Sequence, residues 1–250
     1  MSWETLLAVV AIGAVVGFTG GLFGKGGSAV ATPLLVLAGI PPIIALASPL
    51  PATVPATAVA SYAYWQERLL DWNVVVWSVA FGVPAVALGA YATRWVGGDD
   101  LVTLTEVLIA GLGVRFVLRP GSPHERTVDV RAPRARMVLI AVGAGLASGL
   151  LANAGGFLLA PLYLLILRLP IKQAFASSLA VACVLAVPGT IVHAALGHID
   201  WAVVVAFGLA SIPLSYVGAR FAMRTHPAKL ERAYGAALIV LGVGMLATSF

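Results

Sequence analysis

The chain alternates long apolar stretches with short polar ones. No charged residue lies between Lys25 and Glu67, between Asp71 and Arg94, or between Arg136 and Arg168. About 20 apolar residues suffice to cross the hydrocarbon core of a bilayer, so several stretches can span it and the longest must hold more than one element. Spanning segments must satisfy their own backbone hydrogen bonds, and no barrel-like alternation is present. The pattern therefore predicts an all-α polytopic membrane protein.

Charged residues and turn residues divide the chain into ten predicted helical segments. They are 5–23, 28–40, 42–65, 72–94, 101–118, 135–151, 155–167, 171–196, 200–222 and 231–249. Segments 28–40 and 155–167 are short for a full crossing. We expect these two to be broken or re-entrant helices.

The ten segments read as two copies of five. Residues match at an offset of 128 or 129 along the chain, as in Gly21–Gly149, Gly27–Gly155, Pro33–Pro161, Pro41–Pro170, Ser48–Ser177, Asp71–Asp200, Pro84–Pro213 and Gly89–Gly218. The sequence thus predicts an N-terminal transmembrane repeat at 1–118, a linker at 119–136 and a C-terminal transmembrane repeat at 137–250. Because five is odd, the two copies are expected to be inverted, as in many secondary transporters.

The distribution of basic residues predicts the orientation. Six arginines lie between Arg115 and Arg136 and account for much of the net charge of +5. Under the positive-inside rule the linker is cytoplasmic and both termini lie outside; we expect no nucleic-acid partner. If the short segments do not cross, the repeats become parallel. That alternative would place the basic loop at 224–232 outside, so it is disfavoured.

One lysine interrupts an apolar and glycine-rich stretch, "GGLFGKGGSAVATPLL", at position 25. A broken helix exposes backbone N–H groups whose dipole favours anions, and Lys25 would add a full positive charge beside them. Placing the charge at mid-membrane costs about 2.5–3.5 kcal/mol, so a bound anion would compensate it. Alternatively, Lys25 belongs to a short turn and reaches the membrane surface.

Further polar residues lie in the two segments 42–65 and 171–196. Ser48, Thr53 and Thr57 follow roughly one helical face, although nearby prolines distort it. Hydroxyls on these segments could donate to an anion, or they bond the preceding turn. His193, which matches Tyr64 in the other repeat, is either a proton relay or an ordinary interfacial residue. Asp71 and Asp200 are expected to be N-caps.

The chain lacks the sequence motifs of several common kinds of catalytic and nucleotide-binding site. The stretch "GLFGKGGS" does not have the spacing of a nucleotide-binding P-loop, and no zinc-protease or serine-hydrolase motif is present. The chain has a single cysteine, Cys183, so no intrachain disulfide forms. We expect no enzyme activity, no cofactor and no metal site.

The glycine and proline pattern resembles the sulfite exporter TauE/SafE family over nearly the whole chain. It consists of a glycine core, an apolar run to a proline, a leucine-proline step and an alanine-serine-leucine helix. These fall on Gly24, Gly26, Gly27, Pro33, Pro41 and Ser48, and again on Gly155, Gly156, Pro161, Pro170, Ala176, Ser177, Ser178 and Leu179. Lys25, Asn153, Ala154, Pro49 and Pro51 depart from the pattern. The resemblance implies a transporter that moves sulfite, organosulfonates or related small anions outward.

Together these interpretations predict a secondary transporter in a bacterial inner membrane, with a proton or sodium as coupling ion. The alternatives are a passive anion channel of the same architecture and a non-transporting membrane anchor subunit. The predicted substrate-binding residues are Lys25, Gly26, Gly27, Ser48, Thr53, Asn153, Gly155, Gly156, Ser177 and Ser178.

Overall fold

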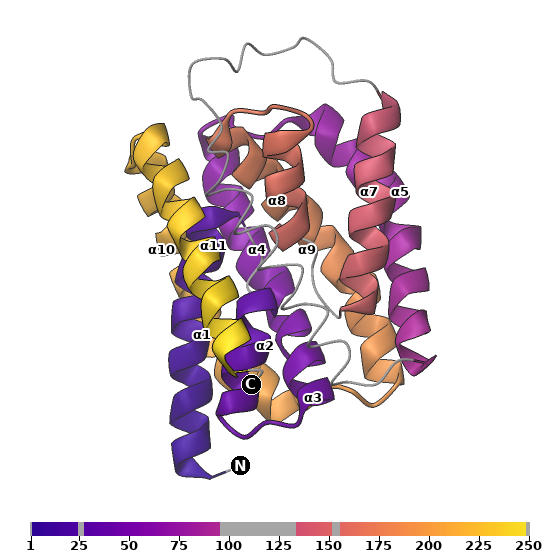
Figure 1. The fold of residues 1–250 in the computed structure, drawn as a ribbon, viewed down its shortest axis with the longest axis vertical. Coiled ribbons are helices and arrows are strands. Elements are labelled where there is room, and N and C mark those ends of the chain that lie inside the picture. Colours follow the sequence, from indigo (N-terminus) through magenta and orange to yellow (C-terminus); the bar gives the residue numbers. More distant parts are fainter. Residues whose placement is uncertain (1, 25–27, 96–133, 152–155, 249–250) are drawn as a thin grey trace.

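The computed structural model describes residues 2–24, 28–95, 134–151 and 156–248, and every regular element in these ranges is helical (Figure 1). The elements are α1 (Trp3–Phe23), α2 (Ser28–Leu37), α3 (Pro42–Ala47), α4 (Pro49–Gln66), α5 (Trp72–Ala92), the 3-10 turn η1 (Thr93–Trp95), α7 (Arg134–Leu150), α8 (Gly156–Leu165), α9 (Ile171–Ala195), α10 (Trp201–Arg224) and α11 (Pro227–Thr248). The predicted all-α class is confirmed for the described residues. The predicted segment 101–118 lies outside them.

Five helical stretches of the described chain are long and apolar enough to cross a membrane. They are Trp3–Phe23, Pro42–Gln66, Trp72–Trp95, Ile171–Ala195 and Trp201–Arg224. A helix of 21 residues, such as α1, is about 32 Å long, which matches a hydrocarbon core of about 30 Å. Large apolar side chains such as Leu88 and Leu209 point outward and are 65% and 71% exposed. Lipid would cover these faces.

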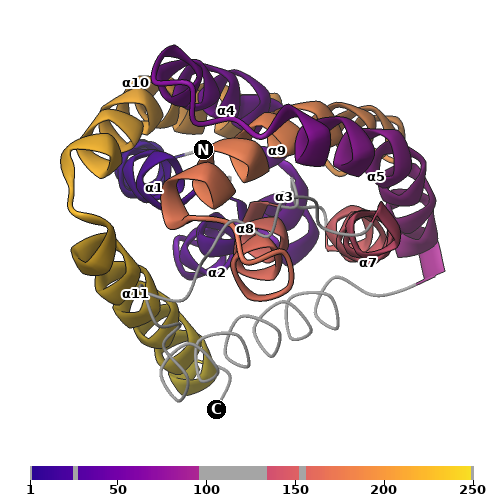
Figure 2. The same ribbon diagram turned by 90° about the horizontal axis from the view of Figure 1, so that it is seen from above.

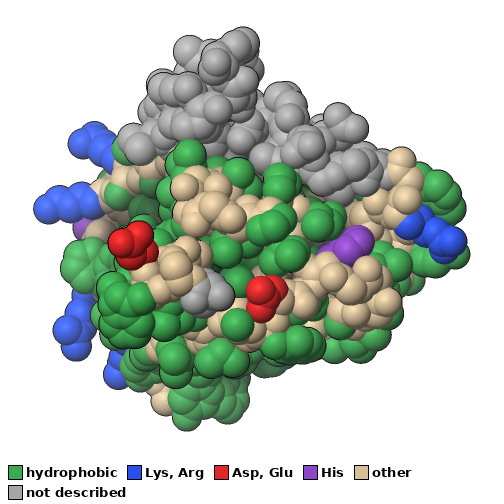
Figure 3. Space-filling model, turned by 90° about the horizontal axis from the view of Figure 1, so that it is seen from below, with side chains coloured by type: hydrophobic (Ala, Val, Ile, Leu, Met, Phe, Trp, Pro, Cys, Tyr) green, Lys and Arg blue, Asp and Glu red, His purple; other side chains and the backbone are tan. Residues whose placement is uncertain are grey.

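The ends of the molecule differ from its flanks. Asp71 and Asp200 cap α5 and α10, and each carboxylate accepts hydrogen bonds from the backbone N–H groups of the second and third residues of its helix. The predicted N-caps are thus confirmed. In the view from the end that carries the N-terminus, hydrophobic side chains cover much of the described surface, and the Lys and Arg side chains in sight lie at the margins (Figure 3).

The short helices α2 and α8 are alike. Each has ten residues and carries a proline at its sixth position, Pro33 in one and Pro161 in the other. Ten residues span about 15 Å, half of the hydrocarbon core, so neither helix crosses the membrane alone. Seen from above, the two lie inside an arc of longer helices that runs from α1 through α10, α4, α9 and α5 to α7 (Figure 2).

Two predicted boundaries differ from the structure. The predicted single helix 42–65 is broken at Ser48, where α3 ends and α4 begins with Pro49. Because Pro49 and Pro51 lack a backbone N–H, they cannot continue the hydrogen bonding of the preceding helix. In addition, α7 begins at Arg134, inside the predicted linker 119–136.

Glycines let two helix pairs pack at very short range. A Cβ on Gly17 would lie 2.5 Å from the Cα of Ser211, and a Cβ on Gly21 would contact the backbone of Ser215, so α1 and α10 run parallel with touching backbones. The pair α5 and α7 repeats this arrangement, because a Cβ on Gly149 would lie 2.6 Å from the backbone nitrogen of Ala90. Close approach through small residues is typical of membrane helices.

Two pairs of helices, α1 with α7 and α4 with α9, run in opposite directions. In Figure 1, α1 rises from the end that carries the N-terminus, whereas α7 descends toward it. The contacts agree. Leu50 of α4 lies against Gly189 of α9, and Val54 accepts a hydrogen bond from Cys183, so these two helices are antiparallel.

Candidate functional site

The predicted substrate-binding residues fall in several places. Five of the predicted residues lie outside the described part of the chain, namely Lys25, Gly26, Gly27, Asn153 and Gly155. The others are Ser48, Thr53, Gly156, Ser177 and Ser178, and the structure does not bring these together in one site. Gly156 is the first residue of α8 and is buried.

Helix α1 stops at a tight contact with α9. Gly24 caps the helix with φ at 66°, and its backbone N–H donates to the carbonyl of Gly20. A Cβ on Gly24 would lie 2.6 Å from the Cα of Phe175. The hydroxyl of Ser178 donates to the Gly24 carbonyl at 2.7 Å. Ser178 therefore holds the backbone at the point where α1 breaks.

Ser48 and Ser177 make matching hydrogen bonds to the opposite half of the chain. The hydroxyl of Ser48 accepts from the backbone N–H of Asp200 at 3.0 Å. Likewise, the hydroxyl of Ser177 accepts from the backbone N–H of Asp71 at 3.1 Å. Both serines are fully buried. In this structure the two hydroxyls thus serve the connection between the halves, at opposite ends of the molecule.

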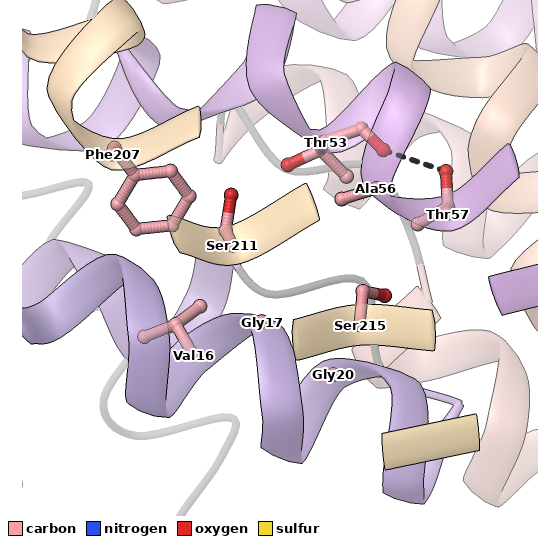
Figure 4. A pocket seen from close by; sticks show the side chains of 9 residues that line it. All are labelled: Val16, Gly17, Gly20, Thr53, Ala56, Thr57, Phe207, Ser211 and Ser215. Carbon is pink, nitrogen blue, oxygen red and sulfur yellow. Dashed lines mark hydrogen bonds between the residues drawn. The ribbon is translucent and has the colours of Figure 1, made fainter. Parts of the chain in front are cut away.

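A small cavity lies between α1, α4 and α10 (Figure 4). It is lined by Val16, Gly17, Gly20, Thr53, Ala56, Thr57, Phe207, Ser211 and Ser215. The space open to the centre of a water molecule is about 10 Å³, which is roughly the room for one water. Of the predicted site residues, Thr53 alone is among the described residues that line this cavity.

The hydroxyls around the cavity are differently engaged. Thr53 donates to the carbonyl of Pro49 at 2.9 Å, and Thr57 donates to the carbonyl of Thr53 at 2.7 Å. The Oγ of Ser211 is buried and has no hydrogen-bond partner among the described residues. Sequence inspection did not select Ser211 or Ser215, because they belong to α10, far from Thr53 along the chain.

The corresponding place in the other half is apolar. At the offsets that relate the halves, Ala182, Ala186, Gly82 and Val86 stand where the cavity has Thr53, Thr57, Ser211 and Ser215. The side chain of Leu185 fills this space, with its Cδ atoms 3.0 and 3.3 Å from a Cβ built on Gly82. Among the described residues, a cavity bordered by hydroxyl side chains is therefore found in this half and not at the corresponding place of the other.

Tyr64 and His193 occupy equivalent positions and make equivalent contacts. The hydroxyl of Tyr64 donates to the carbonyl of Gly21 at 3.3 Å, and Nε2 of His193 lies 3.4 Å from the carbonyl of Gly149. His193 is fully buried, and its Nδ1 lies 3.1 Å from Nδ1 of His198. Partial burial lowers the pKa of His198, which lies in the loop after α9.

These features define a class of protein. Several helices long enough to span a membrane surround the two short helices α2 and α8, and each short helix follows an interruption after a longer one. This arrangement is typical of membrane transporters. The sequence profile of the family described as Sulfite exporter TauE/SafE matches residues 9–245. The chain therefore belongs to the TauE/SafE family and is a membrane transporter.

Relatives agree with this assignment. The chain is 30% identical over 257 residues to a "Probable membrane transporter protein" of Xylella fastidiosa (strain 9a5c), covering 98% of this chain and 95% of the relative. It is also 23% identical over 252 residues to the "Probable membrane transporter protein YjnA" of Bacillus subtilis (strain 168), covering 96% and 99%. No solved structure matches the chain significantly.

Proposed function

We propose that this protein is a secondary transporter that exports sulfite, an organosulfonate or a related small sulfur-containing anion. The observation that carries the proposal is the pair of short helices α2 and α8. They follow α1 and α7 after interruptions at equivalent positions in the two halves. Broken helices at equivalent positions are the best sequence pointer to the binding site of a transporter. The description of the family as sulfite exporters supports the substrate class.

The two halves are proposed to be inverted repeats. Three observations support this arrangement. Matching residues recur at a nearly constant offset, α1 and α7 run in opposite directions (Figure 1), and the bonds of Ser48 and Ser177 to the opposite half are reciprocal. Alternating access then follows from rocking of one repeat against the other around a fixed site.

The orientation follows from the arginine-rich linker. It lies in the cytoplasm, the two termini lie outside, and the membrane is the bacterial inner membrane. Exported anions thus enter the protein from the end where α7 begins.

The proposed anion site is formed by the two helix interruptions, one between α1 and α2 and the other between α7 and α8. Lys25 supplies a formal charge from one repeat, and Asn153 supplies a neutral amide from the other. An ionised partner makes a hydrogen bond about twice as strong as a neutral pair does. Lys25 therefore dominates the affinity, while Asn153 adjusts the fit.

Counterflow on purified protein in liposomes tests the function. The substrates are sulfite, thiosulfate, sulfate, sulfoacetate and taurine. Saturable counterflow of at least one of them is expected from this chain alone. A flux that does not saturate would indicate a channel, and no flux from the purified chain would favour an anchoring subunit.

Replacement of Lys25 tests the site. Lys25→Gln is expected to weaken anion binding by roughly 10- to 150-fold, because a hydrogen bond to a charged group contributes about 1.5–3 kcal/mol. Asn153→Ala should cost about 1 kcal/mol. Affinity is measured by anion-dependent thermal shift or by counterflow.

Lys229→Gln is the matched control, since Lys229 is exposed near the start of α11 and its loss removes the same charge. It should leave the affinity unchanged. An unchanged affinity in Lys25→Gln would instead make Lys25 a surface residue of a turn.

A further inference from the structure

Helix α9 ends in a turn that folds one histidine back onto another. Gly197, just after the helix, has a φ of 74°. The backbone N–H of His198 donates to the carbonyl of His193 at 3.0 Å, and that of Gly197 donates to the carbonyl of Ala194 at 3.1 Å. These are the bonds of a Schellman motif, which brings the side chains at its two ends together. The two imidazoles therefore meet, and their Nδ1 atoms lie 3.1 Å apart.

The end of α4 has the same backbone bonding with different side chains. The backbone N–H of Leu69 donates to the carbonyl of Tyr64 at 3.2 Å. At the offset that relates the halves, Tyr64 corresponds to His193 and Leu69 to His198. Leu69 packs against the apolar cluster to which Tyr64 belongs, and a hydrophobic contact is the common one at these two positions of the motif. The turn itself therefore does not require histidine.

The hydrogen-bond partners assign the protons of the pair. The carbonyl of Gly149 can only accept, so Nε2 of His193, which lies 3.4 Å from it, carries a hydrogen. Nδ1 of a neutral His193 is then a bare acceptor, and Nδ1 of His198 donates to it. Nε2 of His198 is left with a lone pair that can take a proton. A second added proton would set two N–H groups against each other, so the pair binds one.

The helices around the pair bring few charged groups to it. Helices α3, α4, α5 and α8 contain no charged residue. Those of α7, α9, α10 and α11 lie toward the opposite end of the molecule, and they are Arg134, Arg136, Lys172, Arg220, Arg224, Lys229, Glu231 and Arg232.

Two charged residues of the described chain lie at the same end as the pair, and both are engaged elsewhere. Arg94, which follows α5, lies over the ring of Tyr91 at 4.3 Å. The carboxylate of Asp200, in the same loop as His198, accepts from backbone N–H groups of α10. Partial burial therefore has the larger effect, and it lowers the pKa of His198.

We propose that His193 and His198 form a proton-binding site at the outer end of the protein, and that a proton taken up there favours opening of this end. The inference rests on the proposed function, because the two ends open in turn only in a transporter.

The loop that carries His198 also helps to close the outer end. The backbone N–H of Asp200, two residues further on, donates to the hydroxyl of Ser48 in the opposite half. On the other side, His193 faces Gly149, one residue before α7 ends. The pair thus lies where α9, its following loop and the end of α7 meet.

The lowered pKa gives the sign of the effect. When the outer end opens, His198 enters water and its pKa returns toward the ordinary value of about 6.5. The open state then binds the proton more tightly than the closed state, so acid shifts the equilibrium toward opening. Because one proton is bound, the shift is at most about tenfold for each pH unit.

Thermal unfolding without substrate tests proton binding. The folded chain binds fewer protons at His198 than the unfolded chain does, so its stability falls as the pH falls through about 6.5. The double variant His193→Tyr/His198→Leu copies the contact of Tyr64 with Leu69 in the other half. It should lose this part of the decrease in Tm between about pH 8 and about pH 5.5. His198→Leu alone should lose it as well.

His226→Asn is the matched control. His226 is exposed at the start of α11, at the opposite end, and its Nδ1 accepts from the backbone N–H of Ala228. Asparagine retains this capping role without titrating. The variant should keep the acid-dependent decrease in Tm that the histidine pair causes.

Cysteine labelling measures the opening. Ala56→Cys, in the wall of the cavity between α1, α4 and α10, is combined with Cys183→Ser, and an impermeant reagent is added from outside. Because acid slows the reaction of every thiol, each rate is divided by that of the double variant at the same pH. The ratio is expected to rise as the pH falls, by at most about tenfold for each unit.

The outcomes separate this inference from the proposed function. An acid-dependent decrease in Tm that persists in both histidine variants, or a labelling ratio that does not change with pH, overturns the inference. Anion counterflow at about pH 8, where the pair is neutral, is measured alongside. Counterflow beside such a result leaves the proposed transport intact, whereas absent counterflow in the wild-type protein beside a clear pH effect would overturn the proposed function instead.

Discussion

At the scale of single residues, Gly24 shows why a glycine is needed where α1 ends. Its φ of 66° lies in the left-handed region, which costs a residue with a Cβ about 1–2 kcal/mol. In addition, a Cβ at this position would lie 2.6 Å from the Cα of Phe175. Strain and close packing therefore act together at this residue.

Gly24→Ala is expected to destabilise the protein more than Gly39→Ala does. Gly39 has a similar positive φ of 85°, but a Cβ there would meet nothing within 4 Å. Gly39→Ala should thus cost about 1 kcal/mol from strain alone, and Gly24→Ala should add the cost of displacing α9. The measurement is Tm in detergent. Equal losses in the two variants would show that the contact with Phe175 is not important.

The sequence indicated the region of the break but not the residue that makes the contact. Gly27 and Gly155, which were predicted as substrate-binding residues, lie outside the described residues. The sequence alone does not show which of the three glycines around Lys25 ends the helix, because this depends on the backbone angles. The hydroxyls of Ser48 and Ser177 were predicted to contact substrate, whereas here they accept hydrogen bonds from Asp200 and Asp71. The constant sequence offset shows that the two serines are equivalent and that the two aspartates are equivalent. It does not show that each serine contacts the aspartate of the opposite half.

At the scale of elements, glycine determines how closely α7 approaches α5. A Cβ on Gly149 would lie 2.6 Å from the backbone nitrogen of Ala90, whereas Gly143 on the same helix has nothing within 4 Å. Without a hydrophobic driving force between helices in lipid, such van der Waals contact is a main source of helix association.

Gly149→Leu is therefore expected to separate α7 from α5 and to prevent a stable fold. Gly143→Leu, a matched control on the same helix, should be tolerated. Overpacking a tight site costs typically about 1–3 kcal/mol or more. Yield of monodisperse protein and Tm are the measurements. Normal behaviour of Gly149→Leu would mean that the helices can part without loss.

The extents of the elements were largely predictable. Long apolar runs indicate α5, α9 and α10, and the capping aspartates Asp71 and Asp200 mark where α5 and α10 begin, because a spanning helix must be apolar and must satisfy its first N–H groups. The break at Ser48 was less predictable. Prolines also occur inside α5 and α10, at Pro84 and Pro213, without ending those helices, so a proline alone does not mark a boundary.

At the scale of the whole molecule, two equivalent hydrogen bonds join the halves at opposite ends. Ser48 bonds Asp200 at the end that carries the N-terminus, and Ser177 bonds Asp71 at the end where α7 begins (Figure 1). The internal repeat was readable from the sequence. Its pairing in space was not, since an offset carries no information on which helix of one half lies against which helix of the other.

If the halves are inverted repeats that rock, each bond holds one end closed. Ser48→Ala should then favour opening at the outer end, and Ser177→Ala at the cytoplasmic end. Removal of an acceptor costs about 1 kcal/mol, or roughly a fivefold shift in the equilibrium between open and closed ends. The two serines are thus expected to have opposite effects on access, although their contacts in this structure are alike.

Cysteine labelling measures this access directly. In a background with Cys183→Ser, which removes the single native cysteine, Ala56→Cys places a reporter in the wall of the cavity. An impermeant reagent added to either side of oriented vesicles should label it faster from outside in Ser48→Ala and faster from inside in Ser177→Ala. Ser148→Ala is the control, because that hydroxyl donates to Ala144 within its own helix, and it should change neither rate. Faster labelling from the same side in both variants would contradict the inverted arrangement, since only oppositely oriented repeats place equivalent bonds on opposite faces of the membrane.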